Sequence, residues 1–351
     1  MQNSTGKSRR KRGVAASGVA GVAVALLAPM QAATAEPAAP TASVTDGTLV
    51  INGTSHADTI QIGLGADTTT LVVDLGGGTT PVAFSRATFN AISVALGSGD
   101  DTFSVSAAHG NVTEPLTIDG GNGNDAITGG AGNDSILGGN GDDTIFGGAG
   151  NDLIVGADGV DTVDGQRGTD TEILGRGDDV AIWLPGEGND VIEGGLGFDT
   201  LDFVGAAGAE KFALSAEGTG DLFTRDLGTI RMDLNGVEAL DLAALGGADS
   251  ITLHDVHGTG LTEANVDLSG NAVGQQDSVV VEGTDGADDV QIGAAGSAVD
   301  VTGLALTTRI TGSDSTDKLA VNTGAGNDSV QVSDAAAALI TVTADLGTDQ
   351  L

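Results

Sequence analysis

The sequence contains no cysteine and no tyrosine, and its 351 residues include only one tryptophan and eight phenylalanines. Without cysteine, no disulfide can stabilise the fold. With so few large aromatic side chains, the chain lacks what a conventional globular core uses to offset conformational entropy. Yet 40% of the residues are hydrophobic, which is more than a disordered acidic chain carries. Together these features favour thin, regular layers of small apolar residues.

Basic residues are scarce outside the first 35 positions. Five of the 13 Lys and Arg lie in residues 1–35, together with none of the 49 Asp and Glu, so residues 36–351 hold eight basic against 49 acidic residues, a formal charge of −41. Such a surface repels nucleic acid and anionic membranes, and we expect no nucleic-acid partner. It attracts cations instead.

Residues 1–35 have the pattern of an export signal. A basic cluster at residues 7–12 precedes an apolar stretch at residues 14–28 and an A-x-A cleavage motif at residues 33–35. The apolar stretch is shorter than the ~20 residues that a membrane helix needs, so we expect cleavage and no transmembrane span afterwards. The predicted location is secreted, with or without retention at the cell surface. The Arg9-Arg10 pair leaves the choice between general and twin-arginine export open.

Glycine and aspartate are abundant and recur with a period of nine. Four consecutive copies of GGxGxDxUx, where U is apolar, fill residues 120–155, and five decayed copies continue to residue 202, interrupted by the insertion Trp183-Leu184. In each copy, the six residues GGxGxD suit a tight turn and the last three suit a short strand. The Asp of the sixth position recurs at Asp125, Asp134, Asp143, Asp152, Asp161, Asp170, Asp179, Asp190 and Asp199.

Two nonapeptides would form one coil of 18 residues, with the apolar eighth position facing inward. The Asp residues then repeat along two edges of the stack, and along each edge successive coils place them about 4.8 Å apart. Carboxylates at that spacing repel by ~1 kcal/mol in water-like surroundings and by ~3.5 kcal/mol at an effective dielectric constant near 20. A cation between the coils would remove this repulsion. Oxygen ligands favour calcium over magnesium, and the lack of His and Cys in the rows argues against zinc and copper.

The four regular copies resemble the RTX, or haemolysin-type, calcium-binding repeat. In that family, pairs of nonapeptides wind into a parallel β-roll, and calcium lies in the turns between Asp carboxylates and carbonyl oxygens of neighbouring coils. The resemblance implies several Ca²⁺ ions, held by the nine Asp residues above, with the decayed copies the less regular sites. It also implies carbonyl ligands in the turns at Gly121, Gly123, Gly130, Gly132, Gly139, Gly141, Gly148 and Gly150.

The flanking segments contain degenerate versions of the same unit. Residues 53–63 (GTSHADTIQIG) align with residues 283–293 (GTDGADDVQIG), for example. We therefore expect an all-β protein, a parallel β-roll or β-solenoid with a regular centre and degenerate flanks. The expected segments are a signal peptide at 1–35, a linker at 36–46, degenerate repeats at 47–118, the calcium-binding roll at 119–202 and degenerate repeats at 203–351. Five flanking acids are either further ligands or plain turn-formers: Asp58, Asp101, Asp249, Asp288 and Asp328.

No catalytic motif accompanies the repeats. The four histidines are scattered, with His254 and His257 the one close pair, and no G-x-S-x-G sequence occurs. We expect a non-enzymatic protein that folds on calcium and serves as a structural or adhesive module, with a cell-surface or extracellular-matrix partner. The alternative is a polysaccharide-active β-helical enzyme that the repeats only stabilise. Trp183 and Phe198 either form a sugar platform or fill the coil beside the insertion.

Overall fold

The computed structural model describes residues 39–270 and 275–349, which all belong to one compact unit. The expected signal peptide and the start of the linker lie outside the described residues. The described part is almost entirely β-structure, with one short helix, α1 (Asp334–Ala337), and one 3₁₀ turn, η1 (Arg86–Thr88). Within it, no helix is long and apolar enough to cross a membrane.

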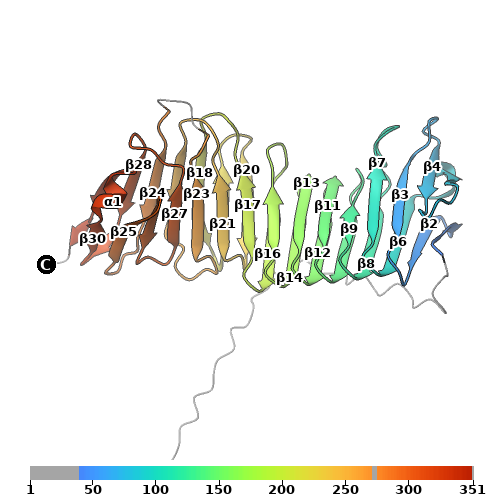
Figure 1. Ribbon diagram of the computed structural model, residues 1–351, viewed down its shortest axis with the longest axis horizontal. Coiled ribbons are helices and arrows are strands. Elements are labelled where there is room, and N and C mark those ends of the chain that lie inside the picture. Colours follow the sequence, from blue (N-terminus) through green and yellow to red (C-terminus); the bar gives the residue numbers. More distant parts are fainter. Residues whose placement is uncertain (1–38, 271–274, 350–351) are drawn as a thin grey trace, which may run out of the picture. The chain divides into compact units, whose positions relative to one another are not determined.

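Two sheets of 15 strands each form the unit, and we call them sheet A and sheet B. Their strands follow one another largely in sequence order (Figure 1). Sheet A runs β1 (Thr41–Thr45), β2 (Thr48–Thr54), β6 (Ala91–Ser98), β8 (Leu116–Asn122), β10 (Ser135–Asn140), β12 (Leu153–Asp158), β14 (Thr171–Arg176), β16 (Val191–Leu196), β20 (Ile230–Asn235), β19 (Gly220–Arg225), β18 (Lys211–Glu217), β22 (Ser250–Leu253), β24 (Ser278–Glu282), β28 (Lys318–Asn322) and β31 (Thr341–Asp345).

Sheet B runs β5 (Val82–Ser85), β4 (Thr70–Asp74), β3 (Thr59–Leu64), β7 (Thr102–Ser106), β9 (Ala126–Thr128), β11 (Thr144–Ala149), β13 (Thr162–Arg167), β15 (Val180–Trp183), β17 (Thr200–Val204), β21 (Ala239–Ala243), β23 (Glu263–Asp267), β27 (Thr307–Thr311), β26 (Ala298–Thr302), β25 (Asp289–Ala295) and β30 (Ser329–Val332). A separate pair is formed by β29 (Ala325–Gly326) and β32 (Thr348–Asp349). The regular and the degenerate repeats thus share the same two sheets.

The central coils repeat every 18 residues, because each strand pairs in parallel with the strand two nonapeptides later. In sheet A, Ile136 of β10 lies opposite Ile118 of β8 and Ile154 of β12. In sheet B, Ile145 of β11 lies opposite Ile127 of β9. These side chains are fully buried and form the core between the two sheets. The predicted parallel β-solenoid is confirmed.

The insertion at Trp183 lengthens one coil without breaking either sheet, since Val180 of β15 still pairs with Thr200 of β17. Trp183 is 1% exposed, stacks on Phe203 with ring centroids 4.1 Å apart, and lies beneath the guanidinium of Arg225. Trp183 therefore fills the core and is no sugar platform. Phe198 is 41% exposed and does not share this cluster.

Hairpins interrupt the coils outside the regular block. Antiparallel strands are inserted at β3–β4–β5, β18–β19–β20 and β25–β26–β27. On either side of these hairpins the parallel pairing continues, for example between β2 and β6 and between β28 and β31. The flanking repeats are irregularly spaced in the sequence because these hairpins differ in length.

Candidate metal centre

Every Asp of the sixth position lies at the end of a turn, directly before a strand, with its side chain turned into the protein. All nine are between 0 and 4% exposed. Those that precede strands of sheet B form row 1: Asp125, Asp143, Asp161, Asp179 and Asp199. Those that precede strands of sheet A form row 2: Asp134, Asp152, Asp170 and Asp190. The structure thus brings the predicted carboxylates together along two opposite edges.

One carboxylate oxygen of each Asp joins two coils. Oδ1 of Asp143 accepts the backbone N–H of Asp125 at 2.8 Å, and Oδ1 of Asp161 accepts that of Asp143 at 2.9 Å. Row 2 repeats the arrangement, since Oδ1 of Asp152 accepts the N–H of Asp134 at 2.8 Å. This hydrogen bond orients each carboxylate along the stack of coils and leaves its second oxygen for another partner.

The second oxygen of most of these residues is buried and has no hydrogen-bond partner. This holds for Oδ2 of Asp125, Asp143, Asp152, Asp161, Asp170, Asp179 and Asp199, and also for Asp101 and Asp249 of the flanks. Burial, with a smaller contribution from the neighbouring carboxylates Asp161 and Asp125, raises the pKa of Asp143 to about 7, although the Asp125 N–H acts in the opposite direction. Burial raises the pKa of Asp161 to about 6 and that of Asp170 to about 7. The ionised forms therefore lack a compensating positive charge.

Backbone carbonyl oxygens of the glycine turns lie against the matching turn of the next coil, along the stack of coils. Gly139 has φ of 120°, and a methyl group on its α-carbon would lie 2.2 Å from the carbonyl oxygen of Gly121. A methyl group on Gly141 would lie equally close to the carbonyl oxygen of Gly123. Glycine is needed here for both the left-handed conformation and the close approach. The same left-handed conformation occurs at Gly121, Gly123, Gly148 and Gly150, whereas Gly130 and Gly132 do not adopt it.

Asp134 differs from the other Asp residues because both of its oxygens have partners. The N–H of Leu116 donates to Oδ1 at 2.9 Å, and the N–H of Gly130 donates to Oδ2 at 2.7 Å. The N–H groups of Thr54 and Thr284 donate in the same way to Oδ2 of Asp58 and Asp288. These three carboxylates act as turn-formers, because the residue four positions earlier directs its N–H at them.

The flanking acids thus fall into two groups. Asp101 and Asp249 keep an unpartnered Oδ2, like the regular repeats, and Gly97 and Gly99 before Asp101 have the same positive φ as the regular turns. Asp328 instead receives the hydroxyl of Thr323 at 2.9 Å. Only the first group resembles the central sites.

Four acids of the flanks continue the pattern of the rows, and three of them, Glu238, Asp277 and Asp317, were missed by sequence reasoning. Glu238 accepts the N–H of Asp199, and Asp249, Asp277 and Asp317 accept the N–H groups of Glu210, Asp249 and Asp277 in turn. The signal that could have found them is an acid directly before a strand and two residues before a buried apolar side chain, as in EAL at residues 238–240. The full GGxGxD pattern of the regular repeats is absent at Glu238, Asp277 and Asp317.

The decayed copies keep the turn conformation although they have lost glycine. Ala157 and Gln166 occupy the second position of their turns with φ of 90° and 66°. A left-handed conformation costs a residue with a Cβ roughly 1–2 kcal/mol. The hydrogen bonds of the coil stack therefore hold these two residues in a strained conformation, and the turns after Asp152 retain the shape of the regular ones.

Glu172 places a further carboxyl in the core, where the row of inward-facing isoleucines is interrupted. It pairs with Ile154 on one side and Ile192 on the other and is 2% exposed. Gly165 donates its N–H to Oε1 at 3.0 Å, while Oε2 has no partner. Burial raises the pKa of Glu172 well above its usual range, and Asp190 adds to the shift.

The donors present fit calcium. They are hard oxygen atoms, namely buried carboxylate oxygens without partners and the carbonyl oxygens of the glycine turns, and calcium binds six to eight such ligands in flexible geometry. In the described ranges, no group of three or more His, Asp or Glu side chains gathers at one point. An ion in these turns would therefore draw on backbone carbonyls as well as on carboxylates. His254 contacts Glu282 at 2.7 Å.

The fold and these turns together form a β-roll whose turns carry oxygen ligands suited to calcium, and comparison with known proteins shows which repeats its central part is similar to. The family model of the RTX calcium-binding nonapeptide repeat matches the chain in four copies, at residues 117–145, 137–172, 146–181 and 186–202. The resemblance to RTX repeats is thereby confirmed for the central part of the chain. No curated protein sequence matches the chain at a significant level.

Proposed function

We propose that this is an exported repeat protein that folds when it binds several Ca²⁺ ions and serves as a structural or adhesive module outside the cell. Residues 119–202 would form the calcium-binding roll, with degenerate solenoid at 47–118 and 203–351 on either side. The observation that carries the proposal is the pair of rows of buried Asp residues, seven of which have one carboxylate oxygen that lacks a partner.

Without cations the two rows oppose folding. Burial disfavours each ionised carboxylate, and like charges face one another one coil apart. Calcium would supply positive charge between the coils and complete the coordination of the unpartnered oxygens. A site whose Kd is a tenth of the ambient calcium concentration stabilises the folded state by ~1.4 kcal/mol. A handful of such sites exceeds the stability margin of many domains.

The proposed ligands follow the two rows. In row 1 they are the carboxylates of Asp125, Asp143, Asp161, Asp179 and Asp199, and in row 2 those of Asp152, Asp170 and Asp190. Carbonyl oxygens of the glycine turns complete the sites. Asp134 is the weakest member of the set, because Leu116 and Gly130 already partner both of its oxygens.

The proposed location and partner rest on charge and on the signal pattern. The basic and apolar residues of 1–35 support export, and the formal charge of −41 on residues 36–351 suits a calcium-rich medium outside the cell. A surface or matrix partner would meet the folded, calcium-loaded solenoid, whose two sheets have 15 strands each. A structural or adhesive role is compatible with such a surface and needs no catalytic group.

A calcium titration of residues 36–351 tests the proposal. Far-UV circular dichroism and the hydrodynamic radius are followed, with magnesium as the control ion. We expect a cooperative increase of β-signal and a compaction with calcium, and neither change with magnesium. A chain that is already compact in chelator would contradict ion-driven folding and would make the Asp rows plain turn-formers.

A further inference from the structure

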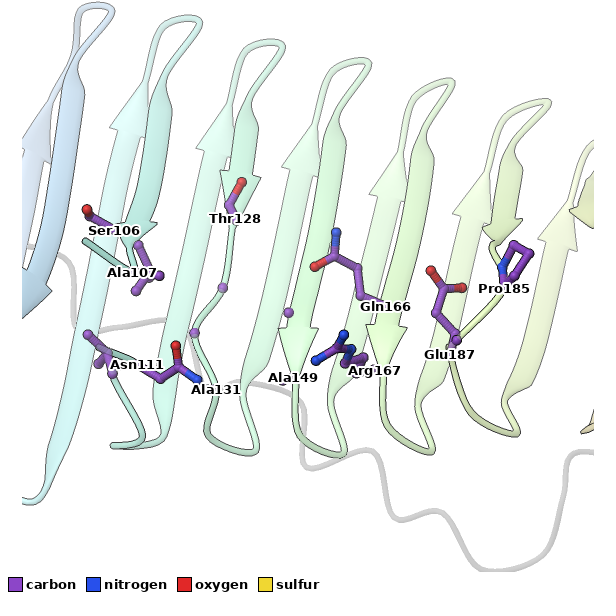
Figure 2. Close-up of a pocket in the computed structure, with 16 residues that line it drawn as sticks. Ser106, Ala107, Asn111, Thr128, Ala131, Ala149, Gln166, Arg167, Pro185 and Glu187 are labelled. Carbon is purple, nitrogen blue, oxygen red and sulfur yellow. The ribbon is translucent and has the colours of Figure 1, made fainter. Parts of the chain in front are cut away.

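A groove with a volume of about 440 Å³ crosses successive coils on the edge of row 2 (Figure 2). Its floor consists of the small residues Gly130, Ala131, Gly148 and Ala149, which come from the second and third positions of two turns. The segment around Ser106 and Asn111 borders one end, and the segment Pro185–Glu187 beside the insertion borders the other. The groove therefore exists only where two irregular segments enclose the flat, regular turns.

Arg167 lines this groove and lacks a carboxylate partner. The described part of the chain contains six arginines, and five of them form ion pairs with Asp or Glu: Arg86, Arg176, Arg225, Arg231 and Arg309. Arg167 is exposed and forms none, although the chain carries 49 acidic residues. An arginine that stays unpaired in so acidic a protein is available to a carboxylate from outside, which its planar guanidinium can bind through two hydrogen bonds.

The other polar groups of the groove offer hydrogen bonds. Glu187 lies at the end opposite Asn111, accepts the N–H of Leu184 at 2.7 Å, and has its pKa raised by burial to about 8. One of its oxygens is thus already hydrogen-bonded within its own segment. Gln166 and Thr128 add an amide and a hydroxyl group to the lining (Figure 2).

We propose that this groove binds a segment of an acidic polysaccharide, with Arg167 holding the carboxylate of a uronic acid unit. Gln166, Asn111 and Glu187 hydrogen-bond the sugar hydroxyls, and the bare backbone of the floor lets the chain approach closely. This inference goes beyond calcium binding, because none of the lining side chains belongs to the Asp rows.

The spacing and the lining favour a sugar chain over a peptide. Successive coils follow one another at about 4.8 Å, close to the length of one sugar unit in an extended chain, whereas an extended peptide advances only about 3.3 Å per residue. Strands β9, β11, β13 and β15 pair on both sides, so no strand edge is open to an added peptide strand here. The lining also offers amide, hydroxyl and backbone groups in place of deep apolar pockets.

The test compares Arg167→Gln with Arg176→Gln, using the full chain with calcium present. Both arginines occupy the third position of a nonapeptide, but Arg176 lies on the other edge and pairs with Asp158. The probe is a short uronic acid oligomer, and the matched ligand is the same oligomer with its carboxyl groups reduced to alcohols. Binding is measured by calorimetry, and circular dichroism confirms that each variant is folded.

We expect Arg167→Gln to weaken binding of the uronic acid oligomer at least tenfold and Arg176→Gln to leave it unchanged. Ala149→Trp, which fills the floor without altering charge, should abolish binding as well. The carboxyl-reduced oligomer should bind weakly to the wild-type protein and equally to Arg167→Gln.

Three results would overturn the proposal. The first is an absence of binding to the folded wild-type protein, and the second is an equal loss in Arg167→Gln and Arg176→Gln, which would indicate nonspecific attraction. The third is preferential binding of a poly-glutamate peptide, which would assign the groove to acidic peptides. None of these results affects the calcium titration, because folding is measured separately.

Discussion

The backbone N–H of Asp143 donates to Oδ1 of Asp161 at 2.9 Å, and the two residues occupy the same place in successive coils. Most Asp residues of the two rows thus use one oxygen to join neighbouring turns and keep the other buried and unpartnered. The same side chain therefore makes a hydrogen bond that stabilises the coil stack and carries a charge that destabilises it. The stack therefore responds to anything that neutralises the second oxygen, whether a proton or a cation.

Replacing Asp143 by Asn should have opposite effects with and without calcium. In chelator, Asp143→Asn removes one charge from row 1 while keeping the oxygen that accepts the Asp125 N–H, so the free energy of unfolding should rise by about 1 kcal/mol or more. In calcium, the loss of a ligand should lower it by ~1.4 kcal/mol if the site contributes as proposed. Denaturant unfolding in both conditions measures the two values.

Asp142→Asn is the matched control, since Asp142 is exposed and Asn occupies the same fifth position at Asn124 and Asn151. Its Oδ1 accepts the N–H of Val160 at 2.9 Å, and Asn can keep that bond. Its charge is the smallest of the carboxylate contributions at Asp143, so we expect a smaller change than for Asp143→Asn in either condition. A calcium response of Asp143→Asn identical to that of the wild type would exclude Asp143 as a ligand.

Asp134 and Asp152 should respond differently to the same substitution. Asp134→Asn places an amide N–H₂ against one of the two backbone N–H groups that Asp134 accepts, so it should cost about 1–3 kcal/mol with or without calcium. Asp152→Asn loses no hydrogen bond, because Oδ2 of Asp152 has no partner, and should destabilise the protein only in calcium. Thermal unfolding of both variants in calcium and in chelator decides whether this division holds.

The stability of the calcium-free chain should fall as the pH rises. The row carboxyls have folded-state pKa values of about 6 to 7, against about 4 in an unfolded chain, so the folded state binds protons more tightly. The contribution of these carboxyls to the free energy of unfolding is fully present below about pH 4 and is lost as the pH rises through about 6 to 7. In calcium the free energy of unfolding should instead increase with pH, because the ion replaces these protons. Unfolding curves measured from about pH 4 to about pH 8 would contradict this if they coincided with and without chelator.

Ala157→Gly should stabilise the protein. The substitution relieves a left-handed conformation that costs a residue with a Cβ roughly 1–2 kcal/mol, at an entropic cost of about 0.5–1 kcal/mol. We expect a net gain of about 0.5–1 kcal/mol in the free energy of unfolding. The control Ala149→Gly lies in a regular turn at a position without positive φ, and should destabilise by a similar amount. Equal effects of the two variants would show that Ala157 is not strained.

The period of the sequence determined the core of the fold. Because Ile and Asp recur every nine residues, the parallel sheets, the 18-residue coil and the two rows of Asp follow from local spacing alone. The flanks were less predictable, because hairpins of different lengths separate their coils, and acids such as Glu238 join a row only after those hairpins have folded away. Sequence spacing could not reveal that alignment.

Two features depended on tertiary structure alone. Asp134 and Asp152 stand in equally regular repeats, yet only Asp152 has an unpartnered oxygen, because the φ angle of the residue four positions earlier decides where its N–H points. The groove beside Arg167 is bordered at its two ends by Asn111 and Glu187, which are far apart in the sequence and line one groove only because the coils stack. Periodicity fixes where each side chain lies along the solenoid, whereas backbone conformation and irregular segments decide what each side chain contacts.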